Sequence, residues 1–259
     1  MNLTTIAGLI IAIVGLIFGM YFKGVAFSAL LQPAAYFIIL MGTAGAVTIA
    51  TPGERLKTLP KLFGILFGGS KSMTKTQAIN SILEFSETTR REGLLALESK
   101  LASINDPFLS TGVRLLMDGA QSEYIVSVME EEISAMEDRH AANAQIFTQA
   151  GTYAPTLGVL GAVMGLIAAL GEMSDTEKLG RAIAAAFVAT LLGIFTGYVI
   201  WLPFANKLKQ KSKLEVEVRR IVIEGILGLQ EGQSTTMLKD RMMAQISESE
   251  RASLGKKQQ

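Results

Sequence analysis

The sequence has no cysteine, a single histidine and little charge, and each shortage excludes a class of function. Without cysteine, the chain has no disulfide, no thiolate zinc site and no thiol nucleophile. The one histidine, His140 in "DRHAAN", provides neither a histidine cluster for a metal nor a motif for a catalytic triad. We therefore predict no enzyme, no metal site and no cofactor.

The net charge is too small to indicate a nucleic-acid partner. Lys and Arg number 24 and Asp and Glu 23 among 259 residues, while 49% of the residues are hydrophobic. A net charge of +1 gives no electrostatic basis for nucleic-acid binding. The mean hydropathy of +0.37 is too high for an ordinary soluble domain. The composition predicts a membrane protein.

Four apolar stretches reach the length of about 20 residues that a bilayer crossing needs. They cover residues 3–22, 34–51, 150–171 and 182–204. None contains an ionisable Asp, Glu, Lys, Arg or His, and Arg181 lies just at the outer edge of the fourth. Because ion pumps and proton relays normally hold such a group in the membrane, the chain by itself lacks a proton carrier.

The distribution of basic residues predicts the orientation of the spans. Segments 53–147 and 205–259 hold ten and eleven Lys and Arg residues, whereas loops 23–33 and 172–181 hold one and two. The positive-inside rule places the two rich segments, and with them both termini, in the cytoplasm. The first span has no basic residue before it and no small-residue cleavage site, so we interpret it as a helix and not as a signal peptide.

Helical periodicity extends through the segment between spans two and three. Apolar residues from Ile79 to Leu101 predict one helix, which "NDP" at 105–107 ends. A second helix is expected from about residue 121 and runs unbroken into span three. A third covers 206–232, and the polar tail from residue 247 is expected to be disordered. No strand pattern is present.

The predicted fold class is an all-α integral membrane protein with four transmembrane helices and a helical cytoplasmic domain inserted between helices 2 and 3. The expected parts are a transmembrane hairpin (1–52), the inserted domain (53–147), the second pair of spans (148–204) and a cytoplasmic helix with its tail (205–259).

Small residues recur at four-residue spacing in three of the spans. The pairs are Gly161 with Gly165, Gly193 with Gly197, and Gly15 with Gly19. Such faces allow helices to approach closely, which matters because lipid gives helices no hydrophobic drive to associate. Packing within one chain is the simplest use of any one pair. Three pairs exceed what a four-helix unit requires, so we also expect an oligomer.

Uncharged polar groups and prolines mark spans three and four. Thr156, Thr190 and Tyr198 can hold a water or coordinate a cation, although a threonine hydroxyl can equally bond back to its own helix. Pro155 and Pro203 lie towards the cytoplasmic ends of their helices, where each removes a backbone donor. We interpret the two prolines as a conformational hinge; the alternative is a proline tolerated near a helix end.

Four segments in order resemble the MotA family of flagellar stator subunits, within the MotA/TolQ/ExbB proton channel family. They read "KGVAFSALLQPAAYFIILMGT", "RREGLLALE", "TYAPTLGVLGAVMGLIAALG" and "AAFVATLLGIFTGYVIWLPFANKL". The likeness covers about residues 1–232 and is strongest to Gram-positive, Bacillus-like members. It implies a stator subunit of the bacterial inner membrane, a homopentamer around a MotB dimer, which carries the membrane aspartate. Ion flow would then produce torque on the rotor protein FliG, with membrane lipid as the remaining partner.

The resemblance also assigns roles to residues. Arg90 and Glu98, eight apart around Gly93, match the family's rotor-interaction pair. On one continuous helix their side chains would lie about 80° apart and could face one rotor surface. Arg91, nearly in line with Glu98, is the rival arginine.

The two prolines and the pore threonine, Thr190, map onto the family's functional positions. Ala162, at a depth similar to that of Thr190, occupies the position where sodium-driven relatives carry a second threonine. An alanine offers no oxygen to a partly dehydrated Na⁺. The resemblance therefore implies a stator driven by H⁺, with drive by Na⁺ as the alternative.

Three other interpretations remain. An ExbB/TolQ-like energiser of a transport complex shares the family but has three spans. A stand-alone transporter is disfavoured because no charge lies inside the spans. A passive membrane scaffold would leave the placement of the threonines and prolines unexplained.

Overall fold

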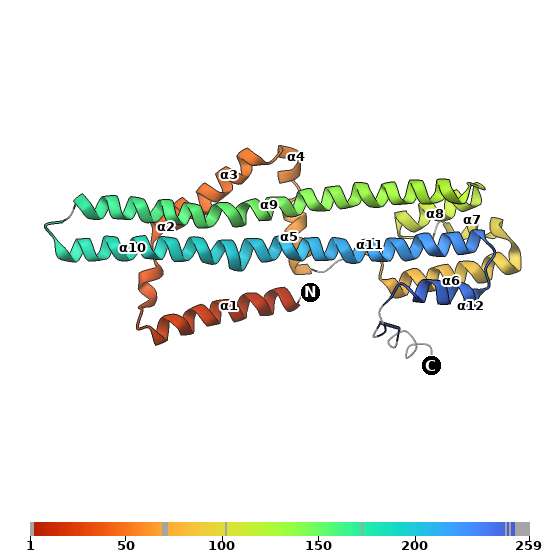
Figure 1. Cartoon of the computed structure of the whole chain (residues 1–259), viewed down its shortest axis with the longest axis horizontal. Coiled ribbons are helices and arrows are strands. Elements are labelled where there is room, and N and C mark those ends of the chain that lie inside the picture. Colours follow the sequence, from red (N-terminus) through yellow and green to blue (C-terminus); the bar gives the residue numbers. More distant parts are fainter. Residues whose placement is uncertain are drawn as a thin grey trace. The chain divides into compact units, whose positions relative to one another are not determined.

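The structure is a computed structural model that describes residues 3–68, 72–101, 103–171, 173–246, 248, 250 and 251. Contacts divide the chain into two compact units. The first comprises Met1–Ser70 and His140–Lys209, and the second Lys71–Arg139 and Gln210–Gln259. Throughout the described ranges the elements are helices and no strand occurs (Figure 1), in agreement with the predicted fold class.

All four predicted spans are present as helices long and apolar enough to cross a membrane. Span one is α1 (Leu3–Phe22), and span two consists of α2 (Pro33–Tyr36), the π-helical turn η2 (Phe37–Met41) and α3 (Gly42–Ala50). Span three lies in α9 (Ser122–Gly171), and span four in α10 (Thr176–Phe195) with the π-helical turn η4 (Thr196–Trp201). The 3₁₀ turn η1 (Phe27–Leu30) lies between the first two spans.

Two helices extend well beyond the length of a span. α9 has 50 residues, which confirms the helix expected to run unbroken from about residue 121 into span three. The fourth apolar stretch ends near Pro203, but helix continues directly after η4 as α11 (Leu202–Gln230). The helix predicted over 206–232 is therefore the continuation of span four.

α9 and α10 are in backbone contact at two glycines. A Cβ built on Gly193 would lie 2.7 Å from the carbonyl oxygen of Ala154 and 2.8 Å from the Cα of Gly158. No residue with a side chain fits at that separation without moving one helix. The two helices run side by side in Figure 1. The close approach predicted from the glycine spacing is thus realised within one chain.

The other pairs of glycines differ in the atoms that lie next to them. Cβ atoms built on Gly161 and Gly165 would each lie 3.2 Å from the Cβ of an alanine on α10. By contrast, a Cβ on Gly15 or Gly19 of α1 would meet nothing within 4 Å. The α1 pair is therefore not used for packing within this chain.

Helices next to the spans complete the first unit. α4 (Gly53–Leu56) and α5 (Leu59–Gly68) follow span two, and α5 packs on both long helices through aromatic rings. The Phe63 and Phe147 centroids are 5.4 Å apart, and those of Phe67 and Phe204 are 5.6 Å apart. Contacts thus group residues 53–70 with the spans; the boundary between membrane and cytoplasm stays a prediction.

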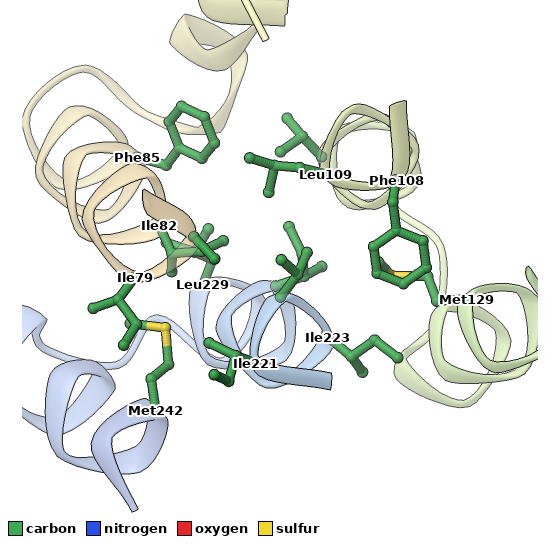
Figure 2. Packing of buried hydrophobic residues seen from close by; sticks show 14 of the residues in the cluster. Ile79, Ile82, Phe85, Phe108, Leu109, Met129, Ile221, Ile223, Leu229 and Met242 are labelled. Atoms are coloured by element: carbon green, nitrogen blue, oxygen red, sulfur yellow. The ribbon is translucent and has the colours of Figure 1, made fainter. Parts of the chain in front are cut away.

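The second unit has its own apolar core. It joins α6 (Lys75–Glu92), α8 (Pro107–Met117) and α12 (Thr235–Met243) to parts of α9 and α11. Figure 2 shows Ile82 of α6 beside Leu229 of α11, Ile79 beside Met242 of α12, and Phe85 on the side of α6 that faces Leu109 of α8. Apolar residues singled out by periodicity, including Ile79, Ile82 and Met129, are fully or almost fully buried.

The single helix predicted from Ile79 to Leu101 is wrong. α6 ends at Glu92, and Gly93 has φ +85° and ψ 167°, a conformation essentially restricted to glycine. The chain continues as the 3₁₀ turn η3 (Leu94–Leu97) and the short α7 (Glu98–Leu101). The leucine spacing reflects burial, since Leu97 is wholly inaccessible to solvent, and not one continuous helix.

The predicted break at "NDP" is also a helix start. The Asp106 carboxylate accepts a hydrogen bond of 3.0 Å from the Leu109 backbone N–H, and Pro107 is the first residue of α8. An aspartate N-cap followed by proline is a common start signal because it satisfies a free donor and pre-sets φ.

The disorder predicted for the tail is wrong at its beginning. Glu250 forms an ion pair with Lys75 at 3.1 Å, and Arg251 donates a hydrogen bond to the Ile246 carbonyl oxygen. The rest of that prediction, for residues 247, 249 and 252–259, lies outside the described residues.

We predict that Gly193→Ala separates α9 from α10. The added methyl group has no space, and overpacking of this kind costs about 1–3 kcal/mol. The midpoint of thermal unfolding of the purified protein is expected to fall by on the order of 5 °C. Gly45→Ala on α3, where a Cβ meets nothing within 4 Å, is the matched control and is expected to leave the midpoint unchanged or slightly higher. Equal midpoints for the two variants would contradict the packing described.

Candidate functional site

Ala162 and Thr190 lie on the same side of the α9–α10 pair. The two helices are antiparallel, since Gly158 of α9 contacts Gly193 and Gly165 contacts Ala186, earlier in α10. Gly161 faces Ala189. Ala162 and Thr190 each follow this contact by one residue, and an equal rotation along two antiparallel helices leads to the same side. The structure therefore brings the two predicted ion-path residues together at one depth.

That side of the pair is open. Its apolar residues are exposed, with Phe187 72%, Ile194 49% and Leu166 47% accessible. Span two covers the opposite side, where Ile39 packs in a cluster with Ala154 and Leu192. We call the side with Ala162 and Thr190 the open face. It presents apolar side chains and the Thr190 hydroxyl, and none of the described residues on it carries a charge.

The hydroxyl groups are satisfied by their own helices. Thr190 donates to the Ala186 carbonyl oxygen at 3.3 Å, and Thr156 donates to that of Tyr153 at 2.7 Å. Donation uses the hydrogen but leaves the oxygen lone pairs free to accept. Thr190 can therefore accept a hydrogen bond from a water or a protonated carboxyl group and remains satisfied when neither is present.

Two predicted ion-path residues lie away from Ala162 and Thr190. Thr156 is six residues from Ala162, a rotation of about 120° around α9, and Tyr198 is eight residues from Thr190, about 80° around the helix. Both are exposed to solvent in the isolated chain. The structure does not bring Thr156 or Tyr198 to Thr190, so a role for them in the ion path stays a prediction.

Pro155 is seated on a glycine of the facing helix. A Cβ built on Gly197 would lie 2.7 Å from the Pro155 Cγ and 2.8 Å from the Gly151 carbonyl oxygen. That carbonyl lacks its helical donor because residue 155 is proline. The Gly197 Cα–H therefore packs against an acceptor that Pro155 has left free, and a weak C–H···O contact of this kind is common between close helices.

Pro203 follows the π-helical turn η4. A proline has no N–H for the carbonyl four residues earlier, and its ring clashes with that carbonyl in a regular α-helix. The wider turn from Thr196 to Trp201 relieves this conflict, and such turns are frequent at functional sites. The hinge role of the two prolines stays a prediction. Pro203 follows an irregular helical turn, and Pro155 lies at a close contact between two helices.

The second predicted site lies around Gly93 in the other unit. Arg90 and Arg91 are in the last turn of α6, and Glu98 is the first residue of α7. All three are exposed, and none forms an ion pair with a described residue. Because Gly93 separates the two helices, the predicted angle of about 80° between Arg90 and Glu98 is wrong, and so is the near alignment of Arg91 with Glu98. The arginines and the glutamate lie on two elements.

Neighbouring contacts hold α7 against α6. Leu97 is buried in the core, and the Lys100 ammonium forms an ion pair with the Glu84 carboxylate on α6. The hydrogen bond from Lys100 to Glu84, aided by their attraction, raises the pKa of Lys100 above its ordinary value. The exposed charges at both sides of Gly93 are thus presented on a fixed bend.

Two features of these sites escaped the sequence reasoning. Gly158 is in backbone contact with Gly193, and Glu84 pairs with Lys100. A spacing of seven residues between Gly151, Gly158 and Gly165 was the available signal for the first. Nothing in the sequence marked the second. Among the described residues no cluster of three or more metal-binding side chains occurs.

We predict that Gly93→Ala strains the bend. A non-glycine residue in this conformation costs about 1–3 kcal/mol. The expected result is a lower thermal unfolding midpoint, measured by circular dichroism on the purified protein. Gly64→Ala, within α5 and with nothing within 4 Å of the added Cβ, is the control and is expected to be neutral or stabilising. If Gly93→Ala behaved like the control, the bend would not depend on glycine.

Comparisons with known proteins converge on one family. Residues 100–221 match the MotA/TolQ/ExbB proton channel family. The chain is 53% identical to Motility protein A of Bacillus subtilis, over 97% of this chain and 93% of the relative. It is 31% identical to Motility protein A of Borreliella burgdorferi, over 98% of this chain and 97% of the relative.

Solved structures agree. The flagellar MotAB stator complex from Bacillus subtilis contains a chain that matches with a TM-score of 0.90 and 53% identity, covering 96% of this chain and 97% of that chain. A chain of C. jejuni MotAB matches with a TM-score of 0.91 at 29% identity and the same coverage.

Proposed function

The chain belongs to the MotA/TolQ/ExbB proton channel family, and we propose that its open face forms one wall of a proton path that a MotB membrane helix completes. The protein is a stator subunit of the bacterial flagellar motor, as its full-length similarity to Motility protein A and to a MotAB stator structure indicates. Ion flow through the stator complex is converted into torque on the rotor.

The observation that carries the proposal is the open face itself. It is apolar, lacks any ionisable group and places Thr190 beside Ala162. Ala162 and Thr190 carry small side chains, which leave room for a carboxylate from a partner helix to approach this part of the wall. The Thr190 oxygen can accept a hydrogen bond from that group when it is protonated. The missing proton carrier is thus supplied by MotB.

Protons are the favoured ion. A partly dehydrated Na⁺ needs several oxygen ligands, and the methyl group of Ala162 supplies none where sodium-driven relatives offer a hydroxyl. A proton needs only the partner carboxylate and a water or hydroxyl beside it. Sodium drive is the alternative within the same function.

The rotor contact is proposed to be FliG, through the exposed charges around Gly93. Arg90, Arg91 and Glu98 have no partner among the described residues, so their charges are available to an external surface. Exposed charge pairs are individually weak and screened by salt, which suits contacts that form and release as the rotor moves. Placing the charges on two elements lets one rotor surface meet both signs.

The proposed assembly is a homopentamer around a MotB dimer in the bacterial inner membrane, with both termini in the cytoplasm. The outward residues of α1, such as Ile11 and Phe18, are exposed in the single chain, and Gly15 and Gly19 are unused within it. Neighbouring subunits and membrane lipid are the proposed partners for that surface.

The runner-up function is an ExbB/TolQ-like energiser subunit, which the family description includes. The four spans of this chain and its near full-length likeness to Motility protein A favour the stator.

The ion test uses a motile host that lacks its own stator. The chain and its cognate MotB are expressed together, and swimming speed is recorded against external Na⁺ at fixed pH, with and without a protonophore. Speed independent of Na⁺ and abolished by the protonophore is expected. Speed that rises with Na⁺ would retain the stator but overturn the proton assignment. A stable complex without motility would favour the energiser.

We predict that Thr190→Val slows the motor. Valine keeps the shape but removes the acceptor oxygen, and loss of one hydrogen bond to a buried partner costs about 1–3 kcal/mol, roughly tenfold in rate. Swimming speed and proton flux are expected to fall while the membrane level of the protein stays constant. Thr48→Val on α3, whose hydroxyl likewise bonds back to its own helix, is the control. Normal swimming of Thr190→Val would remove Thr190 from the path.

We also predict that combining Arg90→Glu with Glu98→Lys abolishes torque and leaves assembly intact. The reversal turns attraction into repulsion at an exposed surface. Swimming and co-purification with MotB are measured together. The control reverses Arg114 and Glu123, which are exposed elsewhere in the same unit, and is expected to swim. Loss of the complex in the first variant would make these residues structural.

A further inference from the structure

Basic side chains collect at one end of the membrane-spanning unit. Arg55 on α4, Lys57 after it, Lys61 on α5 and Lys209 on α11 are all exposed. None of the four forms an ion pair with a carboxylate of the described residues. These four cations belong to one compact unit and are available to an external anion.

The position of α5 fixes where these cations lie relative to the spans. The Thr5 hydroxyl near the start of α1 donates to the Leu66 carbonyl oxygen of α5 at 3.1 Å. The Lys207 ammonium on α11 donates to the Thr4 hydroxyl at 2.8 Å. The first residues of span one and the residues just after span four therefore meet α5 at one level.

A tryptophan at the same level favours the predicted membrane boundary there. Phe63 of α5 packs edge-on against Phe147, which is 5.4 Å away, and against Phe204, which is 6.4 Å away; Trp201 lies 6.2 Å from Phe147. Phe147 and Phe204 are buried in this cluster, whereas Trp201 is only partly buried, and tryptophan is enriched where the hydrocarbon core meets the headgroups. Lys61 is two residues from Phe63 on α5, and Arg55 and Lys57 come shortly before it in the chain, so the predicted boundary would place these cations near the lipid headgroups.

The local charge balance at this level is strongly positive. Residues 51–68 and 205–209 contain five Lys and Arg residues but a single acid, Glu54. Residues 140–171 of α9 contain no acid. The only anions that the level itself supplies in quantity are lipid phosphates.

We propose that Arg55, Lys57 and Lys61, which lie on α4, α5 and the residues between them, form a binding site for the headgroups of anionic phospholipids. The ammonium and guanidinium groups would bind the lipid phosphates, and the acyl chains would lie along the ends of the spans that are next to α5. Bound lipid would hold α5 in the plane of the membrane boundary, where it contacts spans one, three and four. This inference deepens the lipid partner of the proposed function and rests only on the membrane placement, not on the ion or the rotor.

The test measures lipid selectivity directly. The complex of the chain with its MotB is reconstituted in phosphatidylcholine nanodiscs with spin-labelled phosphatidylglycerol or spin-labelled phosphatidylcholine as probe. The association of each probe is measured by electron spin resonance. The unmodified complex is expected to prefer phosphatidylglycerol. Combining R55Q, K57Q and K61Q is expected to lower this preference at least tenfold, because one basic side chain near an anionic surface contributes about fivefold.

A matched control removes the same charge elsewhere. R114Q, R139Q and R220Q together neutralise three exposed arginines of the other unit and are expected to keep the preference. An unchanged preference in the first variant, or an equal loss in both, would overturn the proposal. If the first variant fails to assemble, K57Q and K61Q singly are each expected to lower the preference about fivefold, and no change in either would overturn it. The readout is independent of swimming, so a failed stator assignment leaves this result interpretable.

Discussion

The contact between the backbones of Gly158 and Gly193 is the constraint on which the membrane unit depends. Lipid gives apolar helices no reason to associate, so close van der Waals packing must hold α9 and α10 together. The Cβ that Gly193 lacks would lie 2.8 Å from the Gly158 Cα, which leaves no tolerance for a side chain. In the same helix pair Pro155 of α9 packs against Gly197. The backbone of α9 is irregular at the proline, and a glycine of the facing helix leaves room for it.

This packing decides what the open face offers. With the two helices locked in register, Ala162 and Thr190 come to one side at one depth, while span two covers the opposite side. The hydroxyl of Thr190 bonds to its own helix and carries no desolvation penalty when no partner is present. In the proposed ion path, Thr190 gains a polar contact only when a carboxyl group of the partner lies beside it. An ionisable group on a separate chain would avoid the cost of a permanent charge inside the spans.

Long apolar runs made the four spans predictable, and glycine spacing made the close approach of α9 and α10 predictable. The bend at Gly93 was not, because Leu94, Leu97 and Leu101 keep a helical spacing although α6 ends at Glu92. A positive φ leaves no trace in a single sequence beyond the glycine itself. Ala162 and Thr190 could be paired from the resemblance, but their common side became evident only when the contact of Gly161 with Ala189 set the register. Which side of that pair stays open depends on the packing of span two, a tertiary contact without a local signal.

Cysteine cross-linking tests whether the open face is the wall of the ion path, because the sequence has no native cysteine that could form a competing disulfide. Thr190→Cys is paired with single cysteines scanned along the membrane helix of a MotB freed of any native cysteine, and disulfide formation is measured in membranes. The account predicts a cross-link at positions close to the MotB aspartate and none when the cysteine replaces Phe18, on α1. Efficient cross-linking from α1, with none from position 190, would contradict the assignment of the open face as the wall of the ion path.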